Sequence, residues 1–146
     1  MLNNVVDVNN YILNKLSSIC KNLKIVSAFP SQISEFPIKK PIASVGVVKA
    51  TIPIANCIVE GTNIAGKVRY GTTADFELSL KICVPKTMSG LECYKAFDEV
   101  ADACLRLDEV WVTKVYCEDI KYNRNMGALV LTAGITLKAE LEDKTK

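Results

Sequence analysis

The residues of this chain that could do chemistry are chiefly its six cysteines, because the sequence contains no histidine. Without histidine there is no Ser-His-Asp or Cys-His nucleophile, no Cys-His zinc site and no histidine pH switch. The cysteines are Cys20, Cys57, Cys83, Cys93, Cys104 and Cys117. No two of them form a Cys-x-x-Cys pair, so their spacing fits neither a zinc ribbon nor a redox motif. We expect no metal and no cofactor.

The thiols are interpreted first as structural. Residues 1–7 have neither the basic start nor the apolar segment of a secretory signal, and no segment approaches the ~20 apolar residues of a membrane span. Thiols in a reducing cytosol stay free, and buried ones behave as small apolar side chains. The alternatives are a disulfide, or a reactive thiol at Cys93 or Cys57 in a small thiol-dependent enzyme or ligand-binding domain.

Acidic side chains form three clusters that could be offered as paired catalytic carboxylates. The clusters are Asp98/Glu99/Asp102, Asp108/Glu109 and Glu118/Asp119. General acid–base work needs a perturbed pKa in a cleft, and nothing in the sequence brings these groups together in one. We interpret them as a solvated helix face and turns. We expect no catalytic residue and no enzymatic activity.

Nucleic-acid binding is also not expected. Eighteen Lys and Arg against sixteen Asp and Glu leave a net charge of only +2. Tyr122 beside Arg124 could stack on a base, but a basic, aromatic hairpin tip serves protein contacts equally well.

The elements that must position these residues follow from apolar periodicity. Spacings of three and four predict a helix over residues 4–22, capped by Asn4, with Asp7 in its first turn. A second helix is predicted from a Ser89–Glu92 capping box to residue 107. Its apolar face is expected to carry Leu91, Phe97, Val100, Ala101, Cys104 and Leu105.

Strands are predicted at residues 24–29, 42–52, 74–84, 110–120 and 129–141. The clearest is 74–84, whose strict alternation indicates a half-buried strand. A long loop is expected from Pro30 to Pro41, a turn between strand ends within 53–69, and a frayed tail at 142–146. Helices and strands do not alternate as βαβ units. We therefore predict one α+β domain over 1–146: a mainly antiparallel sheet of about four to five strands with two helices packed on one face.

The last hairpin is expected to be apolar on both faces for part of its length. Val110, Val112 and Tyr116 on one strand, and Val130 and Thr132 on the next, are assigned to the side away from the core. Such a surface indicates an interface, although a wrong register or cover by the long loop would also explain it. The candidate interface residues are Phe36, Lys39, Lys40, Val112, Tyr116, Tyr122, Arg124 and Val130.

In size and element order the chain resembles the tail terminator (tail completion) family of long-tailed phages and contractile bacteriocins. The resemblance rests on the alternating strand at Phe76–Val84, the stop at Pro85, the helix after Ser89, and two closing strands around Tyr122 and Asn123. It covers residues 42–137. It implies an α+β subunit that forms a six-membered ring on the head-proximal end of the tail tube and halts tube growth.

The resemblance further implies that the partners are other copies of the chain, tube and sheath proteins, and a head connector where a head exists. No membrane and no catalytic residue are implied. The protein would act in the host cytoplasm during assembly and then remain in the virion or bacteriocin particle. The alternative within the structural class is another head–tail joining component.

Overall fold

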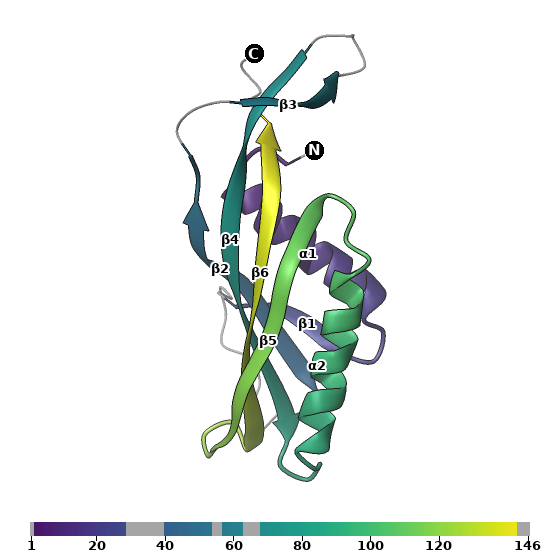
Figure 1. The fold of residues 1–146 in the computed structure, drawn as a ribbon. Helices are drawn as coiled ribbons and strands as arrows, with labels where there is room; N and C mark the ends of the chain where they lie inside the picture. The colour runs from purple at the N-terminus through teal and green to yellow at the C-terminus, as the bar shows by residue number, and fades with distance from the viewer. Residues whose placement is uncertain (1, 29–39, 54–56, 63–67, 143–146) are drawn as a thin grey trace.

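The computed structural model describes residues 2–28, 40–53, 57–62 and 68–142 (Figure 1). The elements are α1 (Val5–Ile19), β1 (Lys24–Ser27), β2 (Ile42–Thr51), β3 (Cys57–Thr62), β4 (Val68–Pro85), α2 (Leu91–Cys104), β5 (Val110–Asn123) and β6 (Ala128–Glu142). Strand runs precede and follow α2 instead of alternating with helices, so this is an α+β fold, as predicted.

The strands form one twisted sheet in the order β1-β2-β4-β6-β5. Only β1 and β2 are parallel, and the other pairs are antiparallel, which confirms the expected mainly antiparallel sheet. Within 53–69, where a turn between strand ends was expected, β3 pairs antiparallel with the first residues of β4, and the residues that connect the two strands lie outside the described ranges. The β3–β4 pair lies beyond the end of β6, whose last partner on β4 is Gly71 (Figure 1).

Both helices pack against the same face of the sheet. Every second residue of β4, from Phe76 to Val84, is buried beneath them, together with the matching residues of β6 from Leu131 to Leu141. α1 contacts β1 and β2, and α2 contacts β4, β5 and β6. The side chains of both helices and of this sheet face form one apolar cluster. Burying each large side chain of that kind contributes about 1.5–3 kcal/mol.

The helix ends follow the sequence in one case and depart from it in the other. Asn4 caps α1 as predicted, since its Oδ1 accepts a 2.8 Å hydrogen bond from the backbone N–H of Asp7. The prediction of a capping box at the start of α2 was wrong. Gly90 is the N-cap, and the backbone carbonyl of Ser89, not its hydroxyl, accepts from the N–H of Glu92 at 3.0 Å. The Glu92 carboxylate pairs instead with Lys95 at 3.2 Å.

The apolar stripe expected on α2 was also partly wrong. The buried face consists of Cys93, Ala96, Val100, Ala103 and Cys104. Leu91 and Leu105, both assigned to the core, are 66% and 84% exposed. A single helix face cannot hold both sets, because these leucines lie about a third of a turn or more from the buried row.

Candidate functional site

Among the described residues, no helix covers the face of the sheet opposite α1 and α2. On β4 it presents Asp75, Glu77, Ser79 and Lys81, which alternate with the buried residues and are exposed or half-buried. Thr132 and Thr136 on β6 continue it. We call this surface the open face. Its polar residues are exposed to water. The large aromatic side chains on it come from β5.

The Tyr116 ring lies over Gly134, its partner on β6. A Cβ atom placed on Gly134 would lie 2.8 Å from Tyr116 Cε1, so only glycine leaves room for the ring in this position. Lys114 Nζ lies 5.1 Å from the centre of the same ring, within the range of a cation–π contact. Trp111 lies further along β5, opposite Lys138, and is 55% exposed.

A hollow of about 350 Å³ lies on the open face, and Thr113, between Trp111 and Tyr116 on β5, forms part of its lining. Its charged lining consists of Lys49, Asp75, Glu77 and Lys138, and Lys138 Nζ forms a 3.1 Å ion pair with Asp75. Lys49 is the cross-strand partner of Glu77. Each cation therefore has an acid beside it, and the hollow offers no unbalanced charge to attract an ion.

The predicted interface residues are distributed over different surfaces. Tyr116 and Val130 lie on the open face, where Val130 packs with a small apolar cluster of Cys83, Ala128, Ile42 and Met126. Tyr122 and Arg124 are exposed at the β5–β6 hairpin end, and Lys40 is exposed before β2. Phe36 and Lys39 lie outside the described residues. The structure thus does not gather the predicted set into one site.

The assignment of Val110 and Val112 to the surface away from the core was wrong. Val110 is 4% exposed, and Val112 packs against the main core. A bulge between Val112 and Lys114 inserts one residue into the alternation of β5. Tyr116 consequently points to the open face although its numbering parity matches that of the valines.

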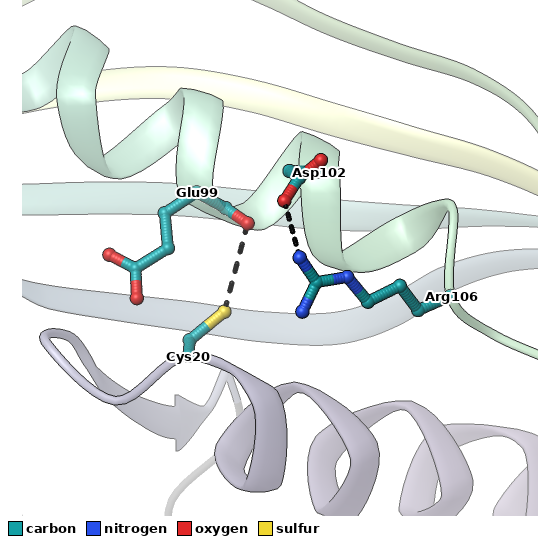
Figure 2. Close-up of polar contacts among 4 residues, drawn as sticks. All are labelled: Cys20, Glu99, Asp102 and Arg106. Carbon is teal, nitrogen blue, oxygen red and sulfur yellow. Dashed lines mark hydrogen bonds and ion pairs between the residues drawn. The ribbon is translucent and has the colours of Figure 1, made fainter.

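Four cysteines occupy the buried positions expected of structural thiols. Figure 2 shows Cys20, just after α1, donating a 3.9 Å hydrogen bond to the carbonyl oxygen of Glu99 on α2. Burial, followed by the charge of Glu99, raises the pKa of Cys20 to about 11. Burial likewise raises the pKa of Cys104 to about 12 and those of Cys83 and Cys93 above their usual value.

These thiols are therefore poor nucleophiles at neutral pH, since the thiolate is the reactive form. This disfavours the hypothesis of a reactive Cys93, which is fully buried. The side chain of Cys57 lies outside the described part of the structure. Cys117 on β5 differs from the buried four because it is exposed.

The acidic clusters lie in solvated positions or serve structural contacts. Asp102 forms a 2.9 Å ion pair with Arg106 on the surface of α2 (Figure 2), and Glu99 accepts a 3.3 Å hydrogen bond from the N–H of Asn22. Asp108 accepts a 2.6 Å hydrogen bond from the Tyr11 hydroxyl. Within the described ranges, no group of three or more cysteines and acids is placed to hold a metal ion.

Comparison with known proteins adds no assignment, since the chain matches no known family model and no curated protein. Neither of the two helices described is both long and apolar enough to cross a membrane.

Proposed function

We propose that this chain is a structural subunit of the tail-terminator kind, which forms a ring on the head-proximal end of a phage or bacteriocin tail tube and stops its growth. The observation that carries the proposal is the open face. A one-sided α+β sheet leaves Trp111 and Tyr116 exposed on it, 55% and 39%, and exposed aromatic surface of this kind favours docking against another protein.

The physical logic is self-limiting assembly. In a closed ring, each subunit contacts its two neighbours through two unlike surfaces. The two rims of such a ring also differ from each other. A ring that binds the tube through one rim therefore cannot bind further tube subunits through the other, and growth of the tube stops. The open face and the β3–β4 pair, which lies at the end of the molecule beyond β6, are two such unlike surfaces. No step in this function requires a nucleophile or a metal.

The experiment is a capping assay on isolated tail tubes, with electron microscopy of the purified chain at high concentration. We expect rings, and tubes blocked at one end. Trp111→Ser should impair capping, whereas Val6→Ser, a control at a 64% exposed site on the outer side of α1, should not. A chain that stays monomeric and leaves the tubes uncapped contradicts the proposal. Binding only to a head connector would indicate a different joining protein.

A further inference from the structure

β5 forms one edge of the sheet, and its outer side has no strand partner among the described residues. The strand has 14 residues and bulges between Val112 and Lys114 and between Cys117 and Ile120, so at ~3.3 Å per residue its open edge is at most roughly 46 Å long. An unpaired edge presents a row of backbone N–H and C=O groups that can pair with another chain. The edge of this sheet at β1 has only four residues.

α2 carries apolar side chains on the flank that borders this edge. One side of the helix faces α1, as the Glu99 contacts with Cys20 and Asn22 show. The other side lies toward β5, because a Cβ on Gly90 would be 3.6 Å from Ile120. Helical spacing places Tyr94, Phe97, Ala101 and Leu105 along that second flank. Leu105 is 84% exposed and Tyr94 43% exposed.

We propose that two copies of this chain pair through β5 and α2 about a two-fold axis that passes beside Tyr116. The β5 strands run antiparallel and join the two sheets into one. An axis perpendicular to the sheet keeps both helix layers on the same side, so α2 of one copy lies alongside α2 of the other. The two observations, the open edge and the apolar flank, thereby become parts of one surface.

The side chains of β5 are self-complementary in this register. Tyr116 lies opposite its own copy, Lys114 lies opposite Glu118, and Trp111 lies opposite Lys121. The last two are an opposite-charge pair and a cation beside an indole, both of which stabilise neighbouring strands. Each of the two unlike pairs occurs twice, because the two-fold axis repeats it.

The faces of the two strands also match. Val112 and Ile120, which oppose each other in this register, both point to the helix-covered face. Shifting the register by two residues places Val112 opposite Glu118 in one direction and Lys114 opposite Ile120 in the other. Both shifts set a charge against an apolar side chain, so the register through Tyr116 is favoured.

The same axis suits α2. The helix begins beside Ile120 and ends at Cys104, and the chain then returns to β5 at Val110, so α2 runs antiparallel to β5. Antiparallel helices related by that axis set Tyr94 opposite Leu105 and Phe97 opposite Ala101. Large side chains then face smaller ones, which permits close helix packing.

This two-fold contact goes beyond the proposed ring. It uses the same surface of both copies and closes at two, whereas a ring needs two unlike surfaces. In dilute solution a dimer of twice the 16.0 kDa chain mass is its expected product, whereas the ring expected at high concentration uses the other surfaces of the chain.

Cysteine cross-linking tests the axis directly. In a Cys117→Ser background, Tyr116→Cys places two thiols opposite each other, with Cα atoms ~4.5–5.5 Å apart, a distance that a disulfide spans. We expect rapid covalent dimer formation under mild oxidation. The control is Trp111→Cys on the same strand and face, whose two copies would be roughly 33 Å apart. Cross-linking of Tyr116→Cys no faster than the control overturns the proposal.

A charge swap tests the register at exposed positions that leave the core intact. Lys114→Glu and Glu118→Lys should each weaken the dimer about tenfold, because each creates two like-charge contacts. The double variant K114E/E118K should restore the wild-type dissociation constant, measured by sedimentation. A double variant as weak as the singles, or singles without effect, contradicts the register. Rings that form while Tyr116→Cys fails to cross-link overturn the two-fold contact alone and leave the ring proposal standing.

Discussion

The Tyr11 hydroxyl joins α1 to the turn between α2 and β5. The substitution Tyr11→Phe removes that link and leaves the aromatic side chain otherwise unchanged. The hydroxyl donates to Asp108 Oδ1 at 2.6 Å and accepts from the N–H groups of Asp108 and Glu109 at 3.0 and 3.1 Å. A single side chain thus holds the start of β5 against the first helix. Few other polar contacts between described residues join segments so far apart in the chain.

The expected loss is about 1–2 kcal/mol of unfolding free energy. A hydrogen bond within the protein contributes about 0.5–1.5 kcal/mol net, and water replaces part of this exposed group of bonds in the variant. For a chain of this size the melting temperature should fall by about 3–6 °C. Urea unfolding at pH 7 measures the difference. Tyr122→Phe, at a 53% exposed ring on β5, is the control and should leave stability unchanged.

The contact between Tyr11 and Asp108 should also make the free energy of unfolding depend on pH. The hydrogen bond from Tyr11 lowers the pKa of Asp108 below its ordinary 3.8, so this contribution is fully present above pH 3.8 and is lost as the pH falls below it. Burial, followed by the bond to Asp108, raises the pKa of Tyr11 above 10.0. That contribution is present below pH 10 and is lost as the pH rises further.

The stability gap between wild type and Tyr11→Phe should therefore be widest between these limits and narrow at both ends. Equal stability of the two proteins at pH 7 would refute the reasoning. A gap that stays constant from pH 7 down to pH 2 would show that the hydroxyl does not act through the Asp108 carboxylate.

Three further predictions concern the core, a cap and the thiols. Ile12→Ala should lose about 2–5 kcal/mol in urea unfolding because Ile12 is fully buried, while Val6→Ala on the same helix should stay within about 0.5 kcal/mol. Asn4→Ala should lose about 1 kcal/mol by the same measurement, since it removes the cap of α1, and an unchanged midpoint would contradict that role. Peptide mass spectrometry after alkylation at neutral pH should find Cys117 modified well before Cys104, whose burial raises its pKa to about 12; equal rates would contradict the buried assignment.

Much of the fold was predictable because it rests on local periodicity. The spacing of Val8, Ile12 and Leu16 defines the buried face of α1 in sequence and structure alike. The alternation from Phe76 to Val84 identifies the core face of β4 equally well. In each case one side of a regular element meets the core, so the period alone determines which residues are buried.

The surfaces were harder to predict because they depend on what each element packs against. Leu105 on α2 fits a core stripe by its chemistry, yet it is 84% exposed on the flank beside β5. The helix packs on the sheet along the row of Val100 and Cys104 instead, and α1 occupies its other side. Which apolar residue is left outside is decided by the neighbouring elements, and a single sequence does not specify their positions.

The placement of Tyr116 depends on a local irregularity of a similar kind. Strict alternation along β5 puts Val112 and Tyr116 on the same face, and the bulge between Val112 and Lys114 separates them. The one feature of the sequence that indicates the placement of Tyr116 lies on the partner strand, β6. Gly134 interrupts the otherwise apolar and threonine-rich run of β6, and a glycine inside a strand indicates close approach by another group. Here that group is the Tyr116 ring, so the residue that reveals the open face is the glycine beneath it.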